Sequence, residues 1–230
     1  MTGKELKILS AGAVKRGVAQ LAKEFERATG TKVAVEFGTA PEMRKRVAAG
    51  ETADVFVVPP AVMDEFQKQG RIAAESRGFL GRSRMGVVVH ARAESPDLSG
   101  TAAFKKALQG GTAVVYNTAS SGLYSAKLME KLGLASELGI RIVVVDTGAA
   151  IMEYVAAHPG AVGLAQISEV MVMIDKGCAV KLAAPLPDEI QNVTSYDAAA
   201  TNGAPDAARD LALHLTSAAA KKLFAATGIS

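Results

Sequence analysis

Short apolar runs alternate with helix-like segments along almost the whole chain. The runs are rich in Val, Ile and Leu without regular polar alternation, a pattern typical of strands buried on both faces of a parallel sheet. The segments between them repeat apolar residues at helical spacing: within 14–29, Val18, Leu21 and Phe25 fall on one face. Strands and helices in this order predict an α/β fold, with mostly parallel sheets flanked by helices.

The individual elements follow from the same pattern. Strands are predicted at 6–9, 32–37, 54–58, 86–90, 113–116, 140–145, 162–165 and 179–182. Helices are predicted at 14–29, 41–49, 61–69, 101–108, 122–132, 148–156 and 207–226. No sequence repeat or low-complexity tract competes with this assignment.

Two stretches interrupt the alternation. After Ile72, the stretch "ESRGFLGRSRMGVVVH" surrounds a strand with polar and Gly-rich segments and has no covering helix. Near the other end, a Pro-rich stretch leads into an extended segment at 193–200. Two extended passages of this kind predict crossovers between two lobes. We expect residues 1–83 and 196–230 to form lobe I and residues 84–195 to form lobe II.

Composition narrows the classes of function. The chain has 230 residues, of which 49% are hydrophobic and 21% charged, as in ordinary globular proteins. No apolar run reaches the roughly 20 residues that a membrane-spanning helix needs. The net charge of +3 is scattered along the chain, and aromatic residues make up 5%, so no nucleic-acid partner is expected. The single cysteine, Cys178, excludes an internal disulfide and is expected to be an inert structural thiol.

Small polar residues follow the predicted strands. The loops "SAGA", "GTAP", "NTASSG", "DTGAA" and "QISE" come directly after strands and contain no His, Cys or Lys. Ligands of open parallel sheets bind at the carboxyl ends of the strands, where helix N-termini offer free N–H groups. Each loop alone is better explained as a helix cap or turn. Together they favour a shared site for a small anion.

Four segments carry a family resemblance: "ILSAGAVKRGVAQLAKEF", "LGRSRMGVVV", "ASSGLYSAKLMEKLG" and "GAVGLAQISEV". In sequence and order they resemble the periplasmic molybdate-binding proteins of ABC importers, and the resemblance covers nearly the whole chain. It implies a two-lobed periplasmic-binding-protein fold of type II. The two lobes would be joined by two crossing strands and would close on the ligand by hinge motion.

The same resemblance argues against molybdate as the ligand. Members of that family hold the oxyanion with hydroxyls from the first two turns, backbone N–H groups of lobe II and a late Tyr. The matching positions here are Ala13, Ala40, Ser121, Gly148 and Gln166, so two hydroxyls and the phenol are missing. Each unpaired oxygen costs about 1–3 kcal/mol. We therefore expect a roomier site, better suited to an organic carboxylate.

The predicted ligand-binding set combines backbone and side-chain donors. It comprises Ser10, Gly12, Ala13, Thr39, Ala40, Arg82, Ser83, Thr118, Ser120, Ser121, Thr147, Gly148 and Gln166. Arg82 stands where the family has a neutral residue, and its guanidinium could pair bidentately with a carboxylate; a solvated arginine is the alternative. Arg84 is a further candidate. Arg44 and Lys15 are also candidates, although a solvated surface position explains both more simply.

No catalytic or metal-binding arrangement is evident. His90, His158 and His214 are expected at packed or surface positions, and no cluster of ligands predicts a metal site or a cofactor. One enzymatic alternative stays open, because some relatives of this fold resemble isomerases of unsaturated tricarboxylates such as aconitate. Proton transfer on such a substrate needs a base within reach of its carbon, and Glu42 and Asp146 are the candidates.

The preferred interpretation is a substrate-binding protein of an ABC importer. Its partners would be a small anion and an ABC permease, and it would act as a monomer without a cofactor. A cytoplasmic ligand-sensing module is a third alternative. The sequence as given shows no export leader before its first strand, so we expect a periplasmic protein if a leader was removed and a cytoplasmic one otherwise.

Overall fold

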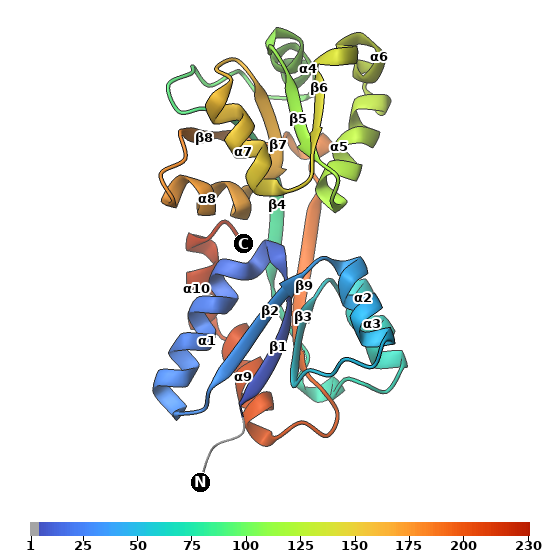
Figure 1. Cartoon of the computed structure of the whole chain (residues 1–230), viewed down its shortest axis with the longest axis vertical. Helices are drawn as coiled ribbons and strands as arrows, with labels where there is room; N and C mark the ends of the chain where they lie inside the picture. The colour runs from blue at the N-terminus through green and yellow to red at the C-terminus, as the bar shows by residue number, and fades with distance from the viewer. Residues whose placement is uncertain (1–4) are drawn as a thin grey trace. The chain divides into compact units, whose positions relative to one another are not determined.

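The computed structural model describes residues 5–230, so the expectation about a leader before Met1 lies outside the described residues. Two compact units divide the chain: Met1–Arg82 together with Thr194–Ser230, and Ser83–Val193 (Figure 1). Strands β4 (Gly78–His90) and β9 (Val193–Ala200) contain the two divisions. The chain thus leaves the first unit along β4 and returns along β9.

The sheet of the first unit has the strand order β2-β1-β3-β9. Its central strand, β1 (Leu6–Ala11), runs parallel to β2 (Val33–Gly38) and β3 (Val55–Val58), while β9 is antiparallel to β3. The helices of this unit are α1 (Lys15–Thr29), α2 (Ala40–Ala48), α3 (Pro60–Lys68), α9 (Asp206–Thr216) and α10 (Ala218–Ala226). Because β1 and β2 are parallel, the turns that follow them start from the same edge.

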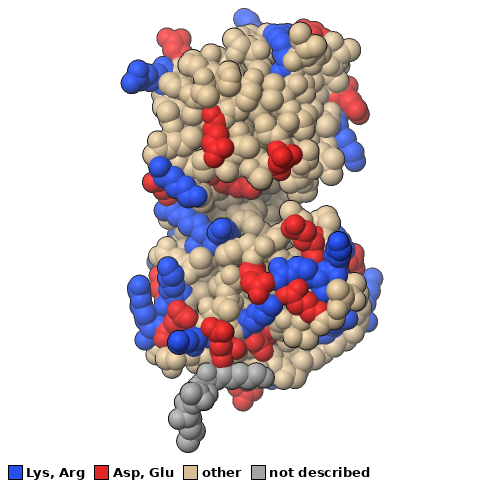
Figure 2. Space-filling view, in the orientation of Figure 1, with Lys and Arg blue, Asp and Glu red and all other residues tan. Residues whose placement is uncertain are grey.

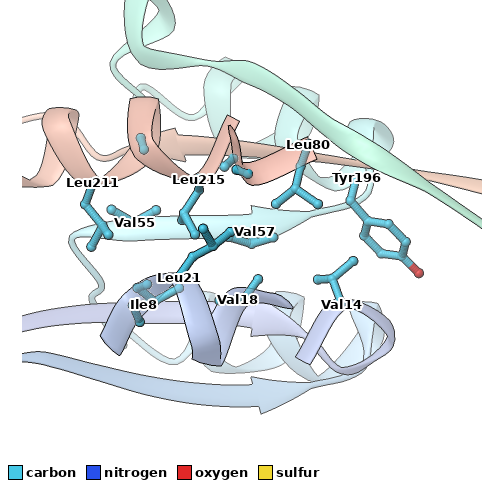
Figure 3. Close-up of a cluster of buried hydrophobic side chains, with 14 of the residues drawn as sticks. Ile8, Val14, Val18, Leu21, Val55, Val57, Leu80, Tyr196, Leu211 and Leu215 are labelled. Atoms are coloured by element: carbon cyan, nitrogen blue, oxygen red, sulfur yellow. The ribbon is translucent and has the colours of Figure 1, made fainter. Parts of the chain in front are cut away.

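Apolar clusters on both faces hold the first unit together. Val55 of β3 belongs to a cluster with α1 and α9, whereas the next residue, Phe56, belongs to a cluster with α2 and α3. This division follows from the alternation of side chains along a strand. Figure 3 shows Leu21 of α1 and Leu211 and Leu215 of α9 converging over the sheet. Burial of each such side chain contributes roughly 1.5–3 kcal/mol.

The sheet of the second unit has the strand order β4-β7-β5-β6, with β8 beside β4. Its strands after β4 are β5 (Val114–Asn117), β6 (Ile142–Val145), β7 (Val162–Gln166) and β8 (Val180–Pro185). Its helices are α4 (Thr101–Gly110), α5 (Ser120–Lys131), α6 (Leu134–Leu138), α7 (Gly148–Ala157) and α8 (Ile167–Asp175). β5 is parallel to β6 and β7, and β4 is antiparallel to β7 and β8.

This topology gathers three helix beginnings at one edge of the second unit. The parallel strands β7, β5 and β6 are neighbours, and their carboxyl ends lead directly into α8, α5 and α7. Separate apolar clusters fill the two faces of this sheet. The α/β class with sheets flanked by helices is confirmed, and both sheets are mixed because each carries antiparallel strands at its β4 or β9 side.

The structure departs from the predicted elements in several places, among them a short helix, α6, that was not predicted. The segment after β7 is helix α8, which was not among the predicted helices. The single helix predicted at 207–226 is two helices, because the Ser217 hydroxyl accepts a hydrogen bond from the amide of Ala220 and starts a new one. β4 begins eight residues before the predicted strand at 86–90, at Gly78.

Within residues 5–230, no helix combines the length and hydrophobicity needed to cross a membrane.

Candidate functional site

Asn117 organises the turn between β5 and α5. Its side chain is buried, and its Oδ1 accepts hydrogen bonds from the amides of Ala119 and Gly122, both at 3.1 Å, and from the Ser121 hydroxyl at 3.3 Å. Gly122 is required here, since a Cβ would lie 1.5 Å from the Asn117 carbonyl oxygen. The turn is therefore rigid before any ligand arrives.

This turn leaves the first amides of α5 available. The hydrogen bonds seen within residues 5–230 give the amides of Ser120 and Ser121 no acceptor. Ser120 is exposed, whereas the Ser121 hydroxyl is buried and engaged by Asn117. Thr118 is exposed, and its hydroxyl donates to the carbonyl of Asp146 at 3.4 Å, which ties this turn to the next one.

The turn between β6 and α7 is also a helix cap. Thr147 is the N-cap residue, and its Oγ1 accepts a hydrogen bond from the amide of Ala150 at 3.1 Å. Gly148 follows as the first, buried residue of α7. An N-cap of this kind leaves the amides of the first two helical residues pointing outward. Asp146, one of the two candidate bases, is exposed at this turn.

Ser83 and Gln166 meet on neighbouring strands of the second unit. Both side chains are buried, at 0% and 5% exposure, and the Ser83 hydroxyl donates a hydrogen bond to Oε1 of Gln166. In this bond Oε1 of Gln166 is the acceptor, so the NH₂ group of the amide lies on the side away from Ser83. The NH₂ group of Gln166 donates to no other residue of the described chain and is left as an oriented, uncharged donor at the end of β7.

Glu169 lies beside this edge as a half-buried acid. It belongs to the first turn of α8, and its Oε2 is buried without a hydrogen-bond partner among the described residues. Burial raises the pKa of the Glu169 carboxyl above its ordinary value. A Cβ built on Gly148 would lie 2.1 Å from Oε2, so the carboxyl packs directly against the beginning of α7. Glu169 was not among the residues predicted to form the site, although it ends the loop "QISE".

The predicted donors of the first unit are largely engaged within the protein. Ser10 is fully buried and its hydroxyl donates to the carbonyl of Ala11 at 3.2 Å. Thr39 forms a capping box with Glu42: the Thr39 amide donates to Oε2 of Glu42 at 2.6 Å, and the Glu42 amide donates to the Thr39 hydroxyl at 3.4 Å. Gly12 is exposed and Ala13 is half-buried, just before α1. Their backbone N–H groups are therefore the more accessible candidates in this unit for donating hydrogen bonds to an anion.

Glu42 is therefore a capping acid in this structure. Its pKa is lowered, first by the hydrogen bond from the Thr39 backbone amide and then by the Thr39 side chain. A carboxylate held by its own helix is a poor candidate for a base that must reach a substrate carbon. Ala40 follows at the first position of α2, next to Pro41, which has no N–H group.

The candidate arginines differ in their partners. Arg82 is exposed, its guanidinium lies 5.4 Å from the ring centre of Phe79, and no carboxylate pairs with it within residues 5–230. Arg84 is ion-paired with Asp188, and Arg44 makes a bidentate pair with Glu65 at 2.6 and 2.9 Å. Of the three arginines, Arg82 is thus the one whose guanidinium pairs with no side-chain carboxylate of the described chain, while its backbone amide donates to the carbonyl-position oxygen of Ser230 at 2.6 Å.

The remaining basic candidate, Lys15, lies over an aromatic ring. Its Nζ is 5.3 Å from the ring centre of Phe37. This contact explains its position without a ligand.

The surface drawn in Figure 2 shows few charged side chains on the second unit and mixed acidic and basic ones on the first.

The histidines and the cysteine do not gather into a site. His158 stacks on Tyr154 at 4.0 Å, His214 packs near Phe25 at 5.8 Å, and His90 accepts from the Arg92 amide. Burial raises the pKa of the Cys178 thiol, as expected for an unreactive cysteine. Among the described residues, no group of three or more His, Cys, Asp or Glu side chains could hold a metal ion.

Proteins of known structure share this arrangement of strands and helices. One relative is an aconitate isomerase from Pseudomonas sp, 28% identical over 234 residues that cover 97% of this chain and 87% of the relative. The substrate-binding domain of a candidate molybdenum ABC transporter from Clostridium difficile superposes with a TM-score of 0.77, at 18% identity and 98% coverage of both chains. The periplasmic molybdate-binding protein of Azotobacter vinelandii gives a TM-score of 0.74, at 19% identity and 98% coverage of both chains.

These structural matches confirm the resemblance to the molybdate-binding proteins at the level of the fold. At 18% and 19% identity they show the fold alone. The model of one family, described as bacterial extracellular solute-binding proteins, matches residues 6–230. The chain therefore belongs to the family of bacterial extracellular solute-binding proteins.

Proposed function

We propose that this protein binds a small organic carboxylate and delivers it to an ABC permease. The observation that carries the proposal is the Ser83–Gln166 pair, which presents an oriented amide NH₂ group at the end of β7. The open amides at the beginnings of α5 and α7 belong to the neighbouring strands of the same edge. Uncharged donors of this kind bind anions without introducing a counter-charge.

A carboxylate is favoured over a compact metal oxyanion. Ala13, Ala40 and Gln166 stand where the resemblance to the molybdate-binding proteins requires two hydroxyls and a phenol. A tetrahedral oxyanion would keep unpaired oxygens, whereas a carboxylate needs fewer donors per group. The aconitate isomerase relative acts, by its name, on aconitate, a tricarboxylate. Arg82, whose guanidinium has no side-chain carboxylate partner in the described chain, would supply a bidentate clamp for the carboxylate.

A binding screen tests this proposal. Thermal unfolding is measured with molybdate, tungstate, sulfate, phosphate, and a series of di- and tricarboxylates. A ligand present at 100 times its Kd should raise the free energy of unfolding by about 2.7 kcal/mol. We expect a carboxylate to give the largest shift. Stabilisation by molybdate or tungstate alone would contradict the proposal.

Three variants locate the site. Gln166→Ala and Arg82→Ala should each weaken the best carboxylate at least tenfold in calorimetric titration, because each removes a donor to the anion. Gln20→Ala is the matched control, since Gln20 is exposed and bonds only its helical neighbour Glu24. Equal affinities for all three variants would place the ligand elsewhere.

An isomerase of an unsaturated tricarboxylate is the second candidate function, favoured by the aconitate isomerase relative. Glu42 is less suited to this role than the sequence indicated, because it caps α2. The test is incubation of the protein at high concentration with cis- and trans-aconitate, followed by NMR. Interconversion above the uncatalysed rate supports an enzyme, and an unchanged isomer ratio removes this candidate.

A further inference from the structure

Two glutamates occupy the same position in two helices and have opposite surroundings. Glu42 is the third residue of α2, and Glu169 is the third residue of α8. An acid at this position commonly folds back to bond the amide of the N-cap residue, as Glu42 does with Thr39. Glu169 does not: its Oε2 is buried and bonded to no residue of the described chain. Its side chain therefore serves something other than its own helix.

The space for this carboxyl is provided by Gly148. A Cβ at that position would lie 2.1 Å from Oε2, 2.5 Å from Cδ and 2.9 Å from Oε1 of Glu169. Gly148 is not among the glycines with positive φ, so its backbone conformation alone does not require glycine. What the glycine supplies is room for an acid at the first residue of α7, where the proposed ligand would meet the open amides.

The Glu169 carboxyl has no counter-ion among the described residues. Within residues 5–230, no lysine, arginine or histidine forms an ion pair with Glu169. Burial is the cause of the raised pKa of Glu169. The charged side chains nearby are Asp175 on its own helix, Glu153 of the packed helix α7 and Lys181 of the packed strand β8, and none of them is a cause of this pKa shift. Burial without a counter-ion disfavours the charged form of this carboxyl, and its neutral form can donate an O–H.

A second polar group points to a ligand at the same edge. Gln166, 5% exposed, is the N-cap residue of α8 three positions before Glu169, and its NH₂ group has no acceptor in the described chain. An anion bound by this NH₂ group and the first amides of α7 would lie next to the Glu169 carboxyl. Ionised, Glu169 would repel that anion; protonated, it would offer one more donor.

We infer that Glu169 is the proton-bearing residue of the anion site and shares one proton with a carboxylate group of the ligand bound at the beginning of α7. The inference rests on the proposed function. Its chemical consequence is specificity: the proton is shared best with a group of similar acidity, as a ligand carboxylate is, and poorly with the anion of a strong acid such as sulfate. Binding is then coupled to protonation of one residue.

Isothermal titration calorimetry with tricarballylate, a saturated tricarboxylate that cannot be isomerised, tests the inference. Titrations are made between pH 6 and 9.5 in pairs of buffers with different ionisation enthalpies. Where Glu169 is ionised in the free protein, each complex forms with uptake of a proton. The Kd should therefore rise up to tenfold per pH unit on the alkaline side, with proton uptake approaching one.

The variant Glu169→Gln should bind with a Kd that is constant over the same range and with no Glu169-linked proton uptake, because the amide keeps a donor but cannot titrate. Glu153→Gln, which removes an exposed carboxylate from α7, is the matched control and should keep the wild-type profile. Tricarballylate binding with the same pH profile in wild type and Glu169→Gln overturns the inference alone. Absence of binding by every carboxylate in the wild type overturns the proposed function and the inference together.

Discussion

At the scale of single residues, Gly148 and Glu169 form a coupled pair. Gly148→Ala should destabilise the wild type by about 1–3 kcal/mol, because the new methyl would overlap the Glu169 carboxyl and force it to move. In a Glu169→Ala background the same change should cost less than about 0.5 kcal/mol, since the clashing atoms are gone. Denaturant unfolding of the four proteins gives the coupling.

The control for this pair is Gly110→Ala. Gly110 ends α4, and a Cβ added there would meet no atom within 4 Å, so alanine should be neutral or stabilising by about 0.4–1 kcal/mol. Equal costs of Gly148→Ala with and without the Glu169 side chain would show that the carboxyl does not occupy the space beside Gly148.

The residues of the candidate site were only partly visible in the sequence. The turn residues Thr147, Gly148 and Gln166 stood out because small polar side chains followed apolar runs. That Ser83 orients Gln166 depends on the pairing of β4 with β7, in which residues far apart in the chain meet, and no local pattern contains this information. Glu169 was missed because it follows a predicted strand in a loop-like segment, and no local pattern shows that its carboxyl packs against Gly148.

At the scale of elements, an ion-pair network joins β1, β2 and α2. Nζ of Lys7 lies 2.9 Å from Glu36 and 2.8 Å from Glu51, and Arg46 pairs with both carboxylates. The hydrogen bonds from Arg46 first, and from Lys7 next, lower the pKa of Glu51 to about 2. The charges are partly exposed, so the network is screened by salt.

This network predicts a defined pH dependence. A carboxyl with a lowered folded-state pKa contributes stability above its ordinary pKa of about 4.5 and loses it as the pH falls toward 2. Thermal unfolding should therefore show a smaller drop in Tm between pH 5 and pH 2.5 for Glu51→Gln than for the wild type. Glu94→Gln, in the exposed loop after β4, should behave as the wild type. Identical curves for Glu51→Gln and wild type would contradict a stabilising role.

Element boundaries show where sequence patterns are informative. The extended segment predicted at 193–200 coincides with β9, and α1 and α7 begin within one residue of their predicted starts. α8 was missed because the polar start "QISE" resembles a loop, although its later residues are apolar. The break between α9 and α10 coincides with the Ser217 cap, within a run in which most residues favour a helix.

At the scale of the whole molecule, the two units differ in how the chain builds them. The second unit is one continuous stretch, Ser83–Val193, and its apolar clusters draw all their residues from it. The clusters of the first unit combine residues from both ends of the chain. A domain with its own core can fold alone. We expect the isolated fragment 83–193 to fold, and residues 1–82 without 194–230 to remain unfolded.

Circular dichroism and cooperative thermal unfolding of the two fragments check this prediction. Mixing 1–82 with a peptide of 194–230 is the complementary experiment and should restore structure in the first. An unfolded 83–193 fragment would mean that its stability depends on the rest of the chain. The α/β class itself was predictable from periodicity, because it depends on the order of apolar runs and helices, whereas the strand order depends on long-range pairing.

The contrast between Glu42 and Glu169 bears on how ligand selectivity can change among proteins that share this fold. The Glu42 carboxylate accepts the amide N–H of its own turn and so keeps that turn from binding an anion. The Glu169 carboxyl, at the corresponding position of another helix, has an Oε2 without a hydrogen-bond partner in the described chain. Each helix follows a strand of a mixed sheet, β2 in the first unit and β7 in the second. On the proposed function, selectivity would reside in a few turn residues, which can be substituted without changing the strands of either sheet.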